Sequence, residues 1–339
     1  MKIKKLNTFL ASICLIAIFT TLPFMAACAA PAPGEPITLK MLTFLPTSYD
    51  VTWTAREFVD RVNARSQGQL TIDWIGGPEI IGYFDQGEAV KNGSIDIVWH
   101  AGALYQDLVP VAAALPLSQH TPTEERKNGF YDWLVEVHKE QMNVMYLGRV
   151  ITNAPHTLWT NFPVQNPRED FKGKLIIGTN MHLPFLNAIG ATNVSIPDPE
   201  TYTAMERGTA EGVAGSPRSA VSGSWQEVLK YWIDYELYWA NNLTLLVNLD
   251  KWNTVPKNMQ KLMQEVAEEV EGEMWASYGE LNSKARQTIL DAGVQPIKFS
   301  EEDGKWLVDL AYSSMWEETK AKGTINPDKL DKLWNYLKK

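Results

Sequence analysis

The sequence predicts an α/β fold with two lobes, in which short strands alternate with helices. This alternation runs from Ile37 to Trp99 and again from Lys174 to Gly215, and it is typical of mainly parallel sheets covered by helices. A third observation is a helical apolar pattern that continues from Pro256 to Ala292 without a break. The chain has 339 residues, 45% of them apolar, which is enough for two separate cores.

The first lobe begins with five elements in a regular order. Ile37–Leu45 alternates as a strand, and apolar residues at helical spacing follow in residues 55–62. Residues 69–75 alternate as a second strand, residues 84–92 form a short helix, and Ile95–Trp99 is an unbroken apolar strand. The order strand, helix, strand, helix, strand predicts a doubly wound lobe.

Further along, Thr121–Glu124 has the sequence of a capping box with proline at the first helical position. It opens a helix in which Trp133 is read as a core residue. The strand Asn143–Val150 then leads toward the second lobe, and two strands, Tyr235–Trp239 and Leu243–Asn248, return from it.

The second lobe is predicted to have the order strand, helix, strand, helix, strand. The first strand is Lys174–Ile177, the first helix is Pro184–Ile189, a second strand follows Gly190, the second helix begins at Asp198-Pro199, and the last strand follows Gly208. The ends of such strands form a ledge on which ligands bind.

The C-terminal third is dominated by the long helix, which is expected to brace both lobes. Its glutamates are interpreted as a solvated face; they are Glu265, Glu268, Glu269, Glu271 and Glu273. We assign residues 37–148 and 240–299 to the first lobe, 149–239 to the second, and 300–339 to C-terminal helices.

The N-terminus resembles a bacterial lipoprotein leader. Lysines at positions 2, 4 and 5 precede an apolar run over Leu6–Phe24. Met25–Cys28 resembles a lipobox, so residues 1–27 are predicted to be a signal peptide, Cys28 the lipidated first residue, and residues 28–36 a tether. The alternative is a plain secretory signal, and a membrane span is disfavoured because the apolar run ends early.

Charge and cysteine content limit the possible partners. The formal net charge is −9, and loss of residues 1–27, with three lysines and no acids, changes it to −12. An acidic chain is a poor partner for nucleic acid. The two cysteines, Cys14 and Cys28, both lie before the predicted globular part, so no disulfide is expected there.

Three blocks of the second lobe resemble one known family. Asp170–Ile177, Ala188–Val194 and Glu200–Gly212 are similar in order and spacing to D-L-K-G-L-K-I-R, A-L-G-A-x-x-V and E-x-Y-x-A-L-x-x-G-x-x-D-G of the receptors of tripartite ATP-independent periplasmic (TRAP) transporters. The resemblance extends over residues 37–299. It implies a two-lobed periplasmic-binding-protein-like fold with crossover strands, a long bracing helix and a ligand cleft between the lobes.

One position departs from the family pattern. The arginine that holds the substrate carboxylate in much of the family is Ile177 here. Arg149, which interrupts an apolar strand, and Arg218 are the candidate replacements, because a guanidinium binds a carboxylate in a planar fork. Arg149 could instead belong to an ion pair, and the segment that holds Arg218 could simply be a helix start capped by Ser216.

The resemblance implies further ligand contacts from the loops after the first and third strands. By position these are Thr47, Tyr49, Trp99 and His100. Asn180 and Trp239 complete the predicted set.

The sequence does not favour an enzyme. It has no Gly-rich phosphate loop, no H-E-x-x-H and no G-x-S-x-G, and the five histidines show no metal-ligand spacing. No cofactor or metal is expected. The resemblance implies an extracytoplasmic, lipid-anchored receptor that binds a small organic acid and delivers it to TRAP permease subunits. The alternatives are a neutral, zwitterionic or cationic-headed solute held by aromatic rings, or a sensor that is not coupled to transport.

Overall fold

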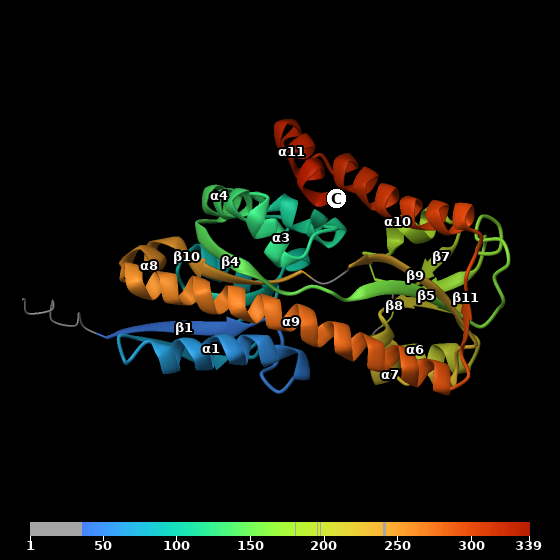
Figure 1. The fold of residues 1–339 in the computed structure, drawn as a ribbon, viewed down its shortest axis with the longest axis horizontal. Helices are drawn as coiled ribbons and strands as arrows, with labels where there is room; N and C mark the ends of the chain where they lie inside the picture. The colour runs from blue at the N-terminus through green and yellow to red at the C-terminus, as the bar shows by residue number, and fades with distance from the viewer. Residues whose placement is uncertain (1–35, 180, 195, 197, 240–241) are drawn as a thin grey trace, which may run out of the picture. The chain divides into compact units, whose positions relative to one another are not determined.

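Two β-sheets form the framework of the chain (Figure 1). The structure is a computed structural model that describes residues 36–179, 181–194, 196, 198–239 and 242–339. The first sheet has the order β2-β1-β3-β10-β4, and the second has the order β11-β9-β5-β8-β6-β7. The strands of the first sheet are β1 (Ile37–Thr43), β2 (Leu70–Gly76), β3 (Ile97–Ala101), β4 (Val144–Ile151) and β10 (Leu243–Asn248). Those of the second are β5 (Pro155–Thr160), β6 (Leu175–Ile177), β7 (Thr192–Val194), β8 (Gly212–Gly215), β9 (Tyr231–Trp239) and β11 (Gln295–Ile297).

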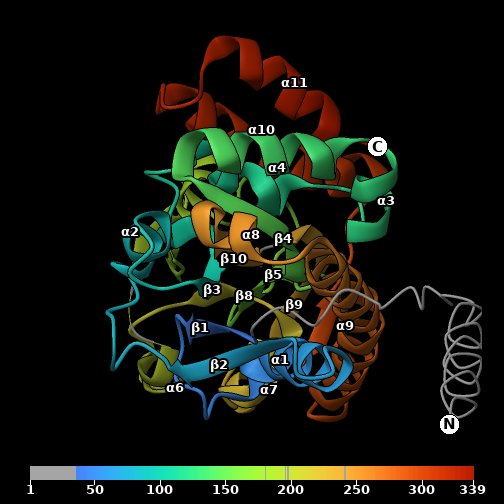
Figure 2. The ribbon, with the colours of Figure 1, turned by 90° about the vertical axis from the view of Figure 1, so that its left-hand side faces the viewer.

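Helices cover the first sheet on both faces (Figure 2). Successive side chains of β3 point to opposite faces. The indole of Trp99 donates to Thr54 of α1 at 3.2 Å, whereas the ring of His100 lies 5.7 Å from that of Tyr105, whose hydroxyl is 3.3 Å from Nε2 of His138 on α4. The helices of this lobe are η1 (Asp50–Thr52), α1 (Trp53–Arg65), α2 (Gln86–Lys91), η2 (Gly102–Leu104), η3 (Pro110–Leu117), α3 (Pro122–Lys127), α4 (Phe130–Met142) and α8 (Leu249–Thr254).

The capping box predicted at Thr121 is confirmed. The Thr121 hydroxyl accepts from the Glu124 amide at 3.2 Å, and the Glu124 carboxylate accepts from the Thr121 amide at 2.8 Å. The helix that it opens is interrupted at Gly129, whose φ of +85° is favourable for glycine. Trp133 is buried on the second of the two resulting helices, as expected for a core residue.

Two pairs of strands join the sheets. β4 leads into β5, β9 leads into β10, and each sheet pairs its two crossing strands antiparallel. Between β4 and β5, Asn153 has φ +33°. Its side-chain amide donates to Trp275 O at 2.8 Å, and its own carbonyl accepts from Asn282 at 2.9 Å. The first connection is therefore fastened to the long helix α9.

α9 (Lys257–Asp291) contacts α1 and β4 in the first lobe and α7 in the second, as Figure 1 shows. Its 35 residues span about 52 Å. The second lobe also has α5 (Leu183–Ala188), α6 (Asp198–Glu206), α7 (Pro217–Ser222) and η4 (Trp225–Glu227), and α10 (Glu301–Ala321) and α11 (Pro327–Leu337) follow. The predicted two-lobed fold with crossover strands and a bracing helix is confirmed. No helix in the described ranges has the length and apolar character to cross a bilayer.

Two details differ from the sequence interpretation. β11, which we assigned to the first lobe, pairs in parallel with β9 of the second sheet. Glu271, which we placed on a solvated face, is buried: its carboxylate accepts from Arg126 Nε at 2.7 Å and from the Arg149 amide at 2.7 Å. A Cβ at Gly148 would overlap this carboxylate, so β4 approaches α9 closely only because position 148 is glycine.

Candidate functional site between the two sheets

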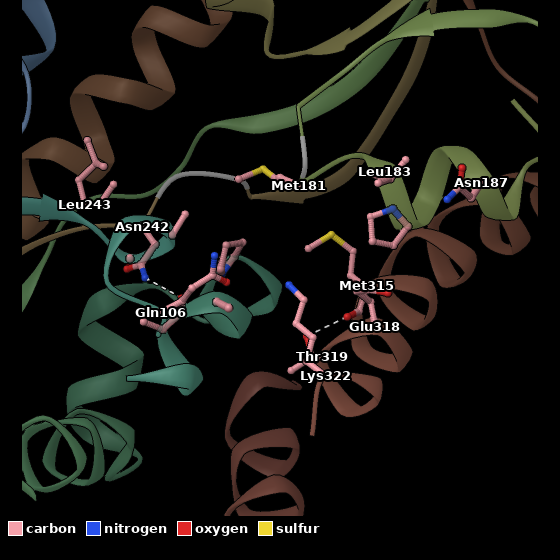
Figure 3. Close-up of a pocket in the computed structure, with 17 residues that line it drawn as sticks. Gln106, Met181, Leu183, Asn187, Asn242, Leu243, Met315, Glu318, Thr319 and Lys322 are labelled. Carbon is pink, nitrogen blue, oxygen red and sulfur yellow. Dashed lines mark hydrogen bonds between the residues drawn. The ribbon is translucent and has the colours of Figure 1, made fainter. Parts of the chain in front are cut away.

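A cavity of about 270 Å³ lies where the end of β3 and the segment after β6 meet α10 (Figure 3). We call it the α10 cavity. Because β3 belongs to the first sheet and β6 to the second, a molecule in this cavity contacts both lobes. Its lining residues are Ala101, Gly102, Ala103, Gln106, Ala112, Ala113, Pro116, Met181, Leu183, Pro184, Asn187, Asn242, Leu243, Met315, Glu318, Thr319 and Lys322.

Most of this lining is apolar, and its charged members are few. Only Glu318 and Lys322 are ionisable, and both side chains are exposed. Glu318 lies on the last turn of α10, and Lys322 is the residue that follows its end. Figure 3 shows the Lys322 side chain extending toward the middle of the cavity. The formal charges of the lining therefore cancel.

Asn242 forms part of the wall on the side of the first lobe. Its Nδ2 donates to Ala112 O at 3.1 Å, and its own carbonyl accepts from the Gly102 amide at 2.8 Å. A Cβ at position 102 would overlap the Asn242 amide, so a larger residue there would displace this side chain. The Oδ1 atom of Asn242 is buried and has no hydrogen-bond partner among the described residues. Rotation of the amide is disfavoured because it would place Oδ1 against the Ala112 carbonyl.

A second hollow, of about 440 Å³, lies between Val51 of the first lobe and helices α7 and α9. We call it the α7 groove. It is lined by Val51, Ala154, Ser216, Arg218, Ser219, Val221, Ser222, Tyr278, Leu281, Lys284, Ala285 and Thr288. The Arg218 guanidinium carbon lies 4.5 Å from the centre of the Tyr278 ring, and Ser216 caps α7 by accepting from the Ser219 amide at 3.1 Å.

Arg149 lies in neither hollow. It is buried at the α3 side of β4, where its guanidinium forms an ion pair with Glu125 and donates to Leu115 O at 3.2 Å. Ser118 donates to the same carboxylate at 2.5 Å. Burial raises the pKa of Glu125, and the neighbouring Arg149 opposes that shift. The arrangement is the ion pair that the sequence left open as an alternative.

The other predicted contacts of the first lobe are mostly internal. Trp99 is fully buried and stacks on Phe44 at 5.1 Å. His100 is also fully buried; neither ring nitrogen has a described partner, and burial lowers its pKa to about 3. The Thr47 carbonyl accepts from Thr52 Oγ1 at 3.2 Å, and Tyr49 is 54% exposed.

Three predicted positions lie outside the residues, or the side chains, that the structure describes. Cys28 and Asn180 belong to the undescribed residues, and for Trp239 only the backbone is described, paired with Pro155.

Comparison with known proteins fits the two-sheet geometry. Residues 43–320 match the family model for bacterial extracellular solute-binding protein, family 7. The chain belongs to this family. Family 7 includes TRAP-type periplasmic solute receptors, which bind small organic ligands and are not enzymes.

Solved structures share the fold of this family 7 chain at low sequence identity. A TRAP periplasmic solute-binding protein of Desulfovibrio salexigens with bound orotic acid has a TM-score of 0.70 and 21% identity, over 88% of this chain and 97% of that one. One of Rhodobacter sphaeroides in an apo open form has a TM-score of 0.76 and 18% identity, over 88% and 98%. A monocarboxylate 2-oxoacid-binding periplasmic protein of Nostoc sp. is 22% identical over 274 residues, 78% of this chain and 74% of that protein.

The family 7 fold brings together two histidines that look unrelated in the sequence. His182, at the start of α5, and His156 of β5 are joined by a 2.7 Å hydrogen bond between Nε2 and Nδ1. Nδ1 of His182 accepts from the Thr179 amide at 3.0 Å, so Nε2 carries the proton and donates. Burial lowers the pKa of His156 to about 4; burial and the neighbouring His156 hold that of His182 well below its usual value. Both rings are therefore neutral at pH 7.

The cavity residues on α10 are the part of the site that the sequence analysis missed. Lys322 follows an ordinary amphipathic helix, and nothing in the sequence near it indicates a ligand. Met181 lies next to the predicted Asn180, and Asn242 lies between the two returning strands, so the position of these two residues at strand ends was the available signal.

Proposed function

We propose that this chain is the extracytoplasmic receptor of a TRAP transporter, and that it binds a small organic acid between its lobes and delivers it to membrane permease subunits. The observation that supports this most directly is the α10 cavity, which has walls from both sheets. A ligand that contacts two lobes at once stabilises their closed arrangement, because its affinity for that arrangement is higher.

Two lines of support favour an acid. The similar protein of Desulfovibrio salexigens holds orotic acid, and the similar protein of Nostoc sp. binds 2-oxoacids. This chain places cations in both hollows, Lys322 in the α10 cavity and Arg218 and Lys284 in the α7 groove. Arg149 is ion-paired with Glu125 outside both hollows, so we propose that it positions β4 and that Lys322 or Arg218 binds the carboxylate.

A binding screen tests the proposal. The full chain is heated with carboxylic acids and with neutral solutes of matched size, and hits are measured by isothermal titration calorimetry. A true ligand at 100 times its dissociation constant adds about 2.7 kcal/mol to the free energy of unfolding. Binding of neutral solutes alone, with no response to any acid, would contradict the acid assignment.

Two variants locate the carboxylate. Arg218→Ala and Lys322→Met each remove one cation from one hollow. We expect one of them to weaken acid binding by about tenfold or more, since hydrogen bonds to charged groups contribute roughly 1.5–3 kcal/mol. If both leave binding unchanged, neither Arg218 nor Lys322 holds the carboxylate and this assignment is wrong.

Attachment to the membrane is a separate part of the proposal. Cys28 follows a lipobox-like sequence, and residues 29–36 are rich in alanine and proline. In cells, Cys28→Ser should prevent incorporation of labelled fatty acid and release the protein from the membrane fraction. Unchanged labelling in the variant would contradict lipidation at this residue.

A further inference from the structure

We propose that the α10 cavity selects an α-amino acid with an apolar side chain, bound as a zwitterion with its carboxylate at Lys322. This inference rests on the proposed function as a solute receptor and names the class of solute. It goes further in assigning ligand selection to α10, a helix outside both sheets.

The size and the apolar lining of the cavity limit which ligands fit. An engineered cavity of about 150 Å³ holds benzene, so by proportion about 270 Å³ holds on the order of eleven non-hydrogen atoms. Leucine and phenylalanine lie on either side of that size. The walls that would contact the side chain are apolar, notably Met181, Leu183 and Met315. A sugar acid has hydroxyl groups on most of its ring carbons, and most of these hydroxyls would face apolar side chains without a hydrogen-bond partner, which is unfavourable.

The two charged side chains of the lining limit the charge of the ligand. Lys322, directly after the end of α10, is four residues from Glu318, and within the described chain neither takes part in an ion pair. A dicarboxylate would leave one of its charges facing Glu318, and a cation without a carboxylate would face Lys322. A ligand that carries one charge of each sign matches a lining that also carries one of each.

Glu318 sets the requirement for an ammonium group. Its carboxylate lines the cavity and takes part in no ion pair within the described chain. A ligand ammonium can pair with it, whereas a keto group in the same place has no charge and no N–H donor. Asn242 Oδ1 also lacks a described partner, but it has almost no accessible surface, so we do not count it as a ligand contact.

A matched series of ligands tests the inference on the full chain. L-leucine, 2-hydroxy-4-methylpentanoate and 4-methyl-2-oxopentanoate share one carbon skeleton and differ only at the second carbon. We expect leucine to bind tightest, the hydroxy acid more weakly, and the oxo acid at least tenfold more weakly than leucine. Succinate should not bind measurably.

Matched variants test the residues. Lys322→Met should weaken leucine binding at least tenfold, whereas Lys320→Met, on the same helix and ion-paired with Glu317 at 2.6 Å outside the cavity, should not. Glu318→Gln should reduce the preference for leucine over the oxo acid, and Glu317→Gln should leave it unchanged. All four side chains are at the surface of α10, so these variants are expected to fold.

The outcomes separate this inference from the proposed function. Equal binding of leucine and the oxo acid, or tighter binding of the oxo acid, overturns the zwitterion assignment and leaves the acid receptor intact. Loss of binding in Arg218→Ala with none in Lys322→Met places the solute in the α7 groove and overturns the inference. If no small solute of any class binds the folded chain, both proposals fail.

Discussion

The two lobes are stabilised by different kinds of contact. The charged side chains that are buried in the described chain, Glu125, Arg149 and Glu271, all lie at the first sheet or on α9 against it. The second lobe instead has a core built on stacked indoles, Trp159 and Trp232, whose ring centres are 5.2 Å apart. Its histidine pair consists of the buried His182 and the partly exposed His156, and both rings are neutral at pH 7.

This difference matters for geometry and for pH. Ion pairs and hydrogen bonds have preferred directions, so the network around Glu125 and Glu271 fixes how α3, β4 and α9 meet. Aromatic packing is less directional. Acid is also expected to act with opposite sign on the Glu125 and Glu271 carboxylates of the first lobe and on the histidine pair of the second, because buried carboxylates take up protons more easily and buried histidines less easily than in the unfolded chain. The buried first-lobe histidines, His100 and His138, respond to acid in the same direction as that pair.

The largest effect is expected from Arg149→Met. It leaves the Glu125 carboxylate buried without its cation, which typically costs 3–5 kcal/mol of the free energy of unfolding. The pKa of Glu125, already raised by burial, should rise further, so that the folded form binds a proton that the unfolded form releases. The loss should therefore be smaller at pH 5 than at pH 8, as measured by urea unfolding at both values.

A double-variant cycle provides the control. In Arg149→Met with Glu125→Gln no charge remains at the site, and we expect part of the lost stability to return. A double variant whose loss of stability equals the sum of the losses in the two single variants would show that the pair does not interact.

Acid should destabilise the second lobe through the histidine pair. The folded pKa of His156 is about 4 against an ordinary 6.5, so between these values the unfolded chain binds a proton that the folded chain does not. The stability that is present above pH 6.5 is therefore lost as the pH falls toward 4. The pKa shift of His156 sets an upper limit of about 3 kcal/mol on this loss in the free energy of unfolding, and the partial exposure of the ring reduces the expected loss to roughly 1–2 kcal/mol. His100 and His138 add to the loss with the same sign.

Thermal unfolding from pH 7.5 to 4.5 measures this dependence, and His156→Gln isolates its source. The variant should lose less stability in acid than the parent chain. Equal acid sensitivity in both proteins would assign the effect to the first-lobe histidines instead.

Replacement of an indole in the second lobe should have a smaller effect that does not depend on pH. Trp232→Phe replaces the indole by a smaller ring, so it reduces the stacking area with Trp159. It also reduces the contact with Arg286, whose guanidinium carbon lies 4.3 Å from the centre of the Trp232 ring. We expect a loss of about 1–2 kcal/mol, the same at pH 5 and pH 8, because aromatic pairs add only 0.5–1.5 kcal/mol beyond their buried area. A loss that changed with pH would show that a titrating group, and not the indole pair alone, stabilises this part of the second lobe.

The smallest effect is expected at the surface between α1 and α9. Arg61 pairs with Glu273 at 2.6 Å, but its side chain is 26% exposed and that of Glu273 is 53% exposed. Arg61→Ala should cost at most about 1 kcal/mol, and less in high salt, because solvent screens exposed pairs. If Arg61→Ala lowered the free energy of unfolding as much as Arg149→Met does, solvent exposure would not be what distinguishes strong from weak ion pairs in this protein.

Much of this architecture could be predicted from local sequence. The capping box at Thr121, the crossing strands and the long helix all have local signals of periodicity and end residues. Glu271 was misplaced because it stands in a run of glutamates. Its spacing from Ala267 and Met274 puts it on the buried face of α9, so the helical period already contained the answer.

The site was less predictable for a physical reason. The sequence near Arg149 and near Lys322 gives no signal of their different roles, because their contacts are long-range. Arg149 pairs with Glu125 of α3, whereas Lys322 extends into a cavity bounded by two other segments. The assignment of β11 to the first lobe was wrong for the same reason, because the pairing of Gln295 with Tyr231 joins strands that are far apart in the sequence and has no local signal.

The connection at Asn153 has a consequence for how the lobes can turn. It is bonded to α9 at Trp275 and at Asn282, two points about 10 Å apart along the helix. If one lobe rotates relative to the other while both hydrogen bonds are kept, the rotation axis lies close to this stretch of α9. Atoms near the axis then move little, and atoms at the far ends of the lobes move most. Spectroscopic labels on α9 near Asn282 would then serve as a fixed reference against which the travel of every other label is measured.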